Sequence, residues 1–332
     1  ADQYVNLVNE ATDNAGLARF WSDEDVEYWK GQDGTNWQDE MLQRAFMQNH
    51  YINYQGSSES SVYSLSFGYL GQDGIYKGTD YERFNIRVNS EHKFGKLRVG
   101  QNFAYNLSNQ NTGGDYYINR TFIMAPTVPV RNEDGTYGYG DPTKGESTLK
   151  NPVAMSELIT WENGQSQFLG NAFLDFEFIE GFNFRTRFGF DNRLVTKKYY
   201  EPAYTLGVIT QEAFGDEADF KDLTWDWENF FTFKRVIKFD HAITAVLGQS
   251  ARHHQNNWLG AKGFGYPSPY VTNIGSVTTN KEIIGSSTEY KMISFYSRLE
   301  YAYREKYYVS FNFRRDGSSR FAESQRWGNF PS

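Results

Sequence analysis

Two acidic side chains, Asp226 and Glu228, are the strongest candidates for covalent chemistry in the sequence. They are two positions apart in a run of alternating residues, so both belong to one face of the expected strand, with Cα atoms roughly 7 Å apart. Paired carboxylates near this separation catalyse hydrolysis in glycoside hydrolases. Charged side chains on the wet face of a sheet explain the same spacing more simply, and we favour that interpretation.

Two other motifs resemble metal sites without supplying a full set of ligands. His253 and His254 are adjacent, and adjacent strand residues point to opposite faces, which argues against shared ligation. Residues 132–136 have the acidic and glycine residues of a calcium loop, but the later Glu is missing, so a turn is favoured. No Ser-His-Asp set or phosphate-binding glycine loop can be placed. We therefore expect no metal ion, no cofactor and no catalytic residue.

Composition excludes some classes of protein and leaves others open. A net charge of -8 without a basic stripe argues against nucleic acid binding. The mean hydropathy of -0.68 is typical of a soluble protein, but 18% of the residues are aromatic. A membrane β-barrel gives the same low average because every second residue faces a wet interior. The absence of an apolar run of about 18 residues thus excludes transmembrane helices only.

Residues 167–193 show the clearest secondary-structure signal. Two runs of strict alternation meet at Glu180-Gly181, which predicts an antiparallel hairpin. One of its faces is aromatic, with Phe182, Phe184, Phe188 and Phe190, whereas the opposite face is charged. A soluble sandwich can bury such an apolar face, so the hairpin alone does not decide between a soluble and a membrane sheet.

The alternation recurs from residue 47 onward and predicts about ten strands. The connections alternate in length: those near 56–60, 93–96, 179–182, 237–241 and 304–307 are short, and those near 71–79, 109–166, 193–223, 255–288 and after 314 are longer. Outer-membrane barrels have short turns at one end and long loops at the other, whereas sandwiches and propellers need no such parity. The sequence therefore favours an all-β, antiparallel transmembrane β-barrel with long extracellular loops.

This interpretation assigns both faces of each strand. The aromatic face would contact lipid, and the charged face would line the barrel lumen. The predicted lumen-facing residues are Arg83, Arg87, Asp175, Glu177, Arg185, Arg187 and Asp191.

Two regions are expected along the chain. Residues 1–46 predict an extracellular loop region with short helices, where Asp2 can cap the first helix and Ser22 begins a capping-box pattern. Residues 47–332 predict the partial barrel. Because Ala1 is not a start methionine and the chain stops at Ser332, we expect a piece of a longer protein.

The sequence resembles a known family at both of its ends. Residues 35–40 and 69–75 resemble SusC/RagA-type TonB-dependent transporters of Bacteroidota outer membranes, whereas residues 109–290 match in pattern only. The most specific match is a run near the end of the chain, which we call the arginine motif. It comprises Arg315, Asp316, Gly317, Ser318, Ser319, Arg320 and Phe321, followed by Arg326, Trp327 and Gly328.

The resemblance implies a function that residue patterns alone do not. It implies a 22-stranded barrel in the bacterial outer membrane, plugged by an N-terminal domain and energised through TonB. It also implies a SusD-like surface lipoprotein as partner and an oligosaccharide or peptide as ligand. The plug and the TonB box are missing from this sequence, so it supplies only part of such a transporter.

Ligand contacts are expected from aromatic residues in the long loops, because aromatic rings stack on sugar rings. Packing of these loops against one another or against a lid protein is the alternative. The runner-up function is a soluble β-rich carbohydrate-binding protein, and a β-glycosidase is a third class. The candidates are Tyr116, Tyr117, Arg120, Tyr137 and Tyr139 in the first long loop, and Trp258 and Tyr266 in the third.

Overall fold

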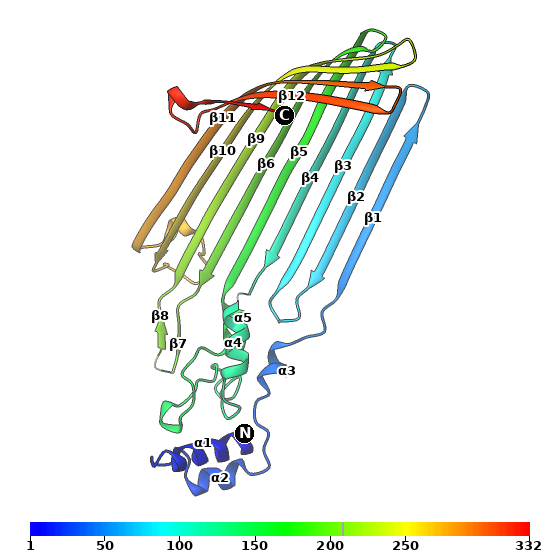
Figure 1. Ribbon diagram of the computed structural model, residues 1–332. Coiled ribbons are helices and arrows are strands. Elements are labelled where there is room, and N and C mark those ends of the chain that lie inside the picture. Colours follow the sequence, from blue (N-terminus) through cyan, green and yellow to red (C-terminus); the bar gives the residue numbers. More distant parts are fainter. Residues whose placement is uncertain (114, 208) are drawn as a thin grey trace.

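One large antiparallel sheet dominates the molecule. The computed structural model describes residues 1–113, 115–207 and 209–332, except for the side chains of residues 115–117. Eleven strands pair strictly with their neighbours along the chain, which confirms the predicted antiparallel order (Figure 1). They are β1 (Met47–Ser57), β2 (Ser61–Asp73), β3 (Asp80–Phe94), β4 (Leu97–Asn111), β5 (Thr160–Ile179), β6 (Phe182–Glu201), β9 (Phe214–Ile237), β10 (His241–Phe264), β11 (Thr279–Tyr303), β12 (Tyr307–Ser318) and β13 (Trp327–Pro331).

The short connections gather at one end of this sheet and the long ones at the other, as Figure 1 shows. We call these ends the turn end and the loop end. The tight turns at 95–96, 180–181, 238–240 and 304–306 lie where the sequence predicts them. Gly181 adopts a φ of +78°, which a glycine reaches without strain.

One face of the sheet carries an apolar band. Residues directly opposite on paired strands share a face, so the register assigns every strand position to one of two faces. On β11, the band runs from the turn end to Ile293, and the same face then continues with Lys291, Glu289 and Ser287 toward the loop end. We call this the band face. It includes Phe84, Ile86, Phe103, Tyr105, Leu174, Phe176, Phe184, Phe188, Trp225, Trp227, Phe231, Phe295, Leu299 and Phe311.

Several strands are much longer than the alternation predicts. The connection expected at 193–223 shrinks to 202–213, and the one expected at 255–288 shrinks to 265–278, because β6, β9, β10 and β11 continue as paired strands. The strand predicted to end near His253 continues to Phe264. These extensions lie beyond the apolar band, where both faces carry polar residues and alternation of apolar and polar residues disappears. The prediction of about ten strands also missed β13, β7 (Tyr204–Leu206) and β8 (Ile209–Gln211).

Among the residues that the structure describes, α-helices occur only at the loop end. They are α1 (Asp2–Asn14), α2 (Asp23–Trp29), α3 (Trp37–Met41), α4 (Asp115–Ile123) and α5 (Pro152–Leu158). None of the helices in the described residues is long and apolar enough to cross a membrane. The main hydrophobic core lies here as well, between α3, the loop after α4, α5 and β7, and not in the sheet.

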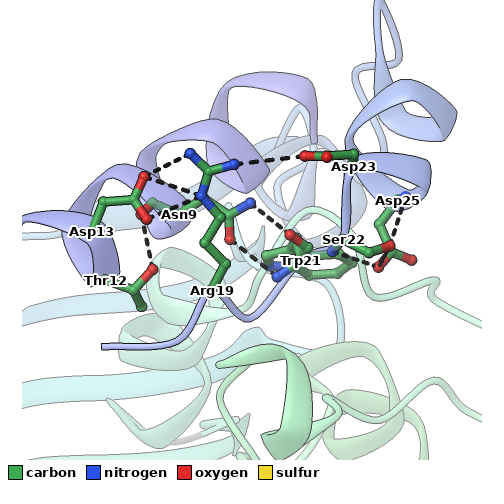
Figure 2. A network of polar contacts seen from close by, with 8 residues as sticks. All are labelled: Asn9, Thr12, Asp13, Arg19, Trp21, Ser22, Asp23 and Asp25. Carbon is green, nitrogen blue, oxygen red and sulfur yellow. Dashed lines mark hydrogen bonds and ion pairs between the residues drawn. The ribbon is translucent and has the colours of Figure 1, made fainter. Parts of the chain in front are cut away.

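Of the two caps predicted for the N-terminal helices, the one at Ser22 forms (Figure 2) and the one at Asp2 does not. The Ser22 hydroxyl accepts a hydrogen bond from Asp25 N–H, and the Asp25 carboxylate accepts one from Ser22 N–H, so the predicted capping box forms. Asp2 does not cap α1, because Ala1 holds that position. The Asp2 carboxylate instead accepts a hydrogen bond of 2.9 Å from Gly31 N–H, which ties α1 to the end of α2.

Candidate functional site

The seven side chains predicted to face the lumen lie on one face of the sheet. Register pairs such as Arg98 with Asp175 and Arg87 with Ala104 connect them across β3, β4, β5 and β6. We call this the polar face, opposite the band face. The residues it brings together are Arg83, Arg87, Asp175, Glu177, Arg185, Arg187 and Asp191.

Cross-strand ion pairs neutralise much of the charge on the polar face. Arg185 Nη2 lies 2.5 Å from Asp175 Oδ2, whose side chain is largely buried, and the Arg185 guanidinium also packs 4.7 Å from the centre of the Phe173 ring. By contrast, Arg83 and Arg87 are exposed and form no ion pair with any described residue. A polar face with some unsatisfied arginines suits contact with water or with another protein domain.

The two carboxylates of the suspected catalytic pair each have an arginine partner. Glu228 Oε2 lies 2.8 Å from Arg187 Nη2, and Asp226 Oδ1 lies 2.6 Å from Arg252 Nε. Both acids belong to the polar face, as their spacing predicts. Each carboxylate therefore forms a cross-strand ion pair with an arginine. This arrangement favours the structural interpretation of the two acids over a catalytic one.

The suspected metal motifs are occupied by protein contacts. His253 lies against the Trp225 ring on the band face, whereas His254 contacts Thr224 and Tyr290 on the polar face. Within the part of the chain that the structure describes, no group of three or more His, Cys, Asp or Glu residues is placed to hold a metal ion.

Residues 132–136 form the turn that the sequence favours. The Gly135 N–H donates to the Asn132 carbonyl at 2.9 Å, and the Asp134 carboxylate accepts from the Thr136 N–H at 3.0 Å. The Thr136 hydroxyl, which also donates to the Asp134 carboxylate, and the Thr136 N–H hold the pKa of Asp134 below its usual range. The acidic oxygen that a calcium ion would require is therefore engaged by the turn itself.

The predicted ligand residues of the first long loop lie within loop contacts. Tyr137 Oη donates to Glu157 Oε2 at 2.5 Å, and the Arg131 guanidinium stacks 4.1 Å from the centre of its ring. Tyr139 packs against the loop core beside Gly207, where a Cβ would collide with its ring. Arg120 is buried, and the side chains of Tyr116 and Tyr117 lie outside the described residues.

The two predicted residues of the third loop differ in position. Tyr266 lies in the 265–278 connection, and its ring meets that of Tyr200 edge to face at 5.2 Å. Burial, with Glu217 nearby, raises the pKa of Tyr266 to about 12. Trp258 is not in a loop, because β10 continues past it, and the register places it on the polar face opposite Phe220. Their rings stack at 5.9 Å.

Trp258 belongs to an aromatic row that sequence reasoning missed. On the polar face near the loop end, Trp161 meets Tyr199 edge to face at 5.3 Å, and the Lys197 ammonium lies 5.3 Å from the centre of the Phe220 ring. The row consists of two contacting pairs on four neighbouring strands, Trp161 on β5 with Tyr199 on β6 and Phe220 on β9 with Trp258 on β10. The two pairs are offset along the strands, because Tyr199 lies opposite Asp216 and Phe220 lies opposite Val195.

A hollow of about 730 Å³ lies beside the first two members of the row. Two of its polar atoms, Thr112 Oγ1 and Asn163 Oδ1, are buried without a hydrogen-bond partner among the described residues. The hollow thus combines flat aromatic surface, a Lys197 ammonium that pairs with no described carboxylate, and unsatisfied acceptors. Its lining is Gln110, Thr112, Trp161, Asn163, Lys197, Lys198, Tyr199, Asp216 and Ala218.

The arginine motif ties the end of β12 to β11 and β13. Ser319 N–H donates to the Lys291 carbonyl and Ser319 Oγ accepts from Lys291 N–H, both at 2.9 Å. Gly317 lies close under the Trp327 ring, because a Cβ at this position would come within 3.0 Å of three ring atoms. Arg315 lies over the same ring, 5.0 Å from its centre.

Comparison with known proteins agrees with this architecture. The chain is 28% identical to TonB-dependent receptor P3 of Formosa agariphila, over 99% of this chain and 34% of that protein. It is 26% identical to TonB-dependent receptor SusC of Bacteroides thetaiotaomicron, over 91% of this chain and 32% of that protein. The chain is a homologue of the SusC-type TonB-dependent receptors. No protein-family model matches it.

The solved structures agree on the fold. The RagAB peptide transporter superposes with a TM-score of 0.76 at 20% identity, over 93% of this chain and 37% of that one. All these relatives are named receptors or transporters. Receptors of this type are outer-membrane proteins, and the homology places the chain in the outer membrane. The chain spans about a third of the length of the SusC-type receptors it matches.

Proposed function

We propose that this chain forms about half of the wall and several extracellular loops of an outer-membrane transporter that imports oligosaccharides. In this proposal the sheet closes into a 22-stranded barrel with strands from the rest of the protein, the polar face lines the lumen, and the band face contacts lipid. The names of the relatives support import that depends on TonB. A SusD-like lipoprotein would be the partner at the loop end. Residues 1–46 would be extracellular.

The aromatic row is the observation that carries the ligand class. Flat rings present apolar surface to the carbon face of a sugar, while amide and hydroxyl acceptors hydrogen-bond its hydroxyl groups. Trp161 and Tyr199 supply the rings beside the 730 Å³ hollow, and Asn163 and Thr112 supply acceptors. The hollow lies on the polar face near the loop end, on the route from the extracellular mouth into the lumen.

The polar face has a second role in this proposal. Arg83 and Arg87 are exposed and unpaired with described carboxylates, so they would meet the plug domain of the complete protein. Glu177 and Asp191 would do the same. The paired charges at Arg185 with Asp175 would keep the wall rigid at a small net cost in desolvation.

Peptide import is the second candidate, because RagAB is named a peptide transporter. At 20% identity that likeness shows the fold alone, whereas the row of rings flanked by amides suits sugars.

Uptake by cells that express the complete receptor and its lipoprotein partner tests the proposal. We expect accumulation of a labelled oligosaccharide from a panel of plant and algal glycans, and none of a labelled peptide mixture. Trp161→Ala should lower uptake about tenfold, the loss expected for a stacking contact of about 1.4 kcal/mol. Trp227→Phe on the band face is the matched control and should transport normally. Uptake of peptides alone, or of neither class, would refute the proposal.

A further inference from the structure

The upper border of the apolar band can be located on the strands. Between the turn at 304–306 and Ile293, the band face of β11 carries Tyr303, Tyr301, Leu299, Ser297, Phe295 and Ile293. A tilted transmembrane strand needs about 9–11 residues to cross the hydrocarbon layer. The level of Ile293, which lies beside Ala251 on β10, is therefore where lipid headgroups would begin.

A second hollow, of about 410 Å³, opens at this level on the band face. Its walls are apolar, with Trp225, Ala251, Ile293 and Trp327. Lys291 and Arg326 lie at its rim. An apolar groove at the border of a lipid-facing band has the shape for the first part of an acyl chain, and cations at its rim match a phosphate.

Two arginines with no carboxylate partner among the described residues lie at or next to this hollow: Arg326 lines it, and Arg315 lies over the ring of Trp327, which also lines it. Arg314 pairs with Asp316 at 2.7 Å, and Lys291 pairs with Glu289 at 2.7 Å. By contrast, Arg315 and Arg326 form no ion pair with any described residue: Arg315 lies over the Trp327 ring, and Arg326 Nε donates to the Phe321 carbonyl at 3.3 Å. Both guanidinium groups are thus oriented by the motif and retain free N–H donors.

Positive charge at the border of the band occurs on the later strands, with Lys221 on β9 and Lys291 on β11. On the first strands, the band-face residues just beyond the apolar band are neutral or acidic: Asp73 on β2, Glu82 on β3, Asn109 on β4, Ser166 on β5 and Asn192 on β6. If the border needed only polar residues for contact with water, β11 and β12 would not need more positive charge than these first strands. An anionic group bound at the hollow would explain the positive charge on β11 and β12.

We propose that the hollow binds a phosphorylated lipid of the outer leaflet, with its phosphate between Arg315 and Arg326 and an acyl chain against Trp225 and Ile293. This inference rests on the proposed orientation, in which the loop end is extracellular. It also gives the arginine motif a role in the membrane, separate from the transport route on the opposite face.

Native mass spectrometry of the complete receptor in detergent tests the inference. Bisphosphorylated lipid A is the probe, and the same lipid A after phosphatase treatment is its neutral counterpart. We expect the phosphorylated form to be retained at least tenfold more than the dephosphorylated form, and excess inorganic phosphate to displace little of it. The double variant Arg315→Gln/Arg326→Gln should lose this preference. Arg83→Gln/Arg87→Gln removes the same charge from the polar face and should keep it.

Three results would overturn the inference: equal retention of the two lipids by the unchanged receptor, an unchanged preference in the Arg315/Arg326 variant, or stronger retention of phosphatidylglycerol, a lipid of the inner leaflet. Strand content by circular dichroism identifies a variant that has not folded, and the single variant Arg326→Gln then replaces the double one. Uptake of the labelled glycan is measured on the same variants to separate the two proposals. Loss of the lipid preference with normal uptake contradicts only the lipid site, and loss of uptake with a normal lipid preference contradicts only the proposed transport function.

Discussion

At the scale of single residues, side chains that are adjacent in the sequence lie in different environments on the two faces of the sheet. Phe188 lies on the band face and is 48% exposed in the isolated chain, whereas Arg187 lies on the polar face in an ion pair with Glu228. An exposed phenylalanine of this size has no favourable contact with water, and a lipid bilayer removes that cost. The chemistry of a position is thus set by which side of the pleat it occupies.

A charged side chain on the band face should destabilise the folded receptor. Phe188→Arg is expected to destabilise the complete receptor by about 2–4 kcal/mol if the residue sits near mid-bilayer. Ser250→Arg is the matched control, because Ser250 pairs with Glu228 on the polar face at nearly the same height, and its effect should stay within about 0.5 kcal/mol. Urea unfolding in lipid vesicles measures both. Equal stability of the two variants would contradict the assignment of faces.

At the scale of elements, the helices and loops form a unit that segments far apart in sequence hold together. The loop core contains Trp37 and Met41 of α3, Met155 of α5 and Leu206 of β7. The Trp37 indole N–H donates to the Ala125 carbonyl at 2.9 Å, which joins α3 to the loop after α4, 88 residues further along the chain. On the outside, Lys144 Nζ lies 2.5 Å from the Asp25 carboxylate and 5.0 Å from the centre of the Trp21 ring.

This ion pair predicts a pH dependence for the N-terminal helices. The Lys144 ammonium, aided by Ser22, lowers the pKa of Asp25 from 3.8 to about 2. A lowered carboxylate pKa stabilises the folded state fully above the ordinary value and loses that contribution as pH falls through about 2. Trp21 fluorescence should therefore report loosening of α2 as pH falls from about 4 to 2. Asp25→Asn should lack this step, and a step of unchanged size in that variant would refute the assignment.

At the scale of the whole molecule, the main sheet has no hydrophobic core of its own. It is a single layer with an apolar band on one face, and its edge strands β1 and β13 present unpaired backbone groups. The buried apolar cluster belongs to the loop end. Such a sheet needs lipid on one side and further strands at its edges to be stable.

Solubility follows from this architecture. The 332-residue chain is expected to aggregate in buffer without detergent and to become monodisperse when a mild detergent covers the apolar band. Analytical ultracentrifugation with and without detergent measures the change. A folded monomer without detergent would support the soluble carbohydrate-binding alternative and would exclude the barrel wall.

The sequence alone determined the strands near the turn end, the tight turns and the two faces of each strand. These features are local: alternation between Phe184 and Arg185 records a boundary between two environments, and Glu180-Gly181 has the conformational freedom of a turn. Beyond the band both faces are wet, so the alternation vanishes, and only tertiary pairing shows that β9, β10 and β11 continue. Only the register brings Trp161 together with Tyr199 and Phe220 together with Trp258, because no local pattern records which residues become neighbours.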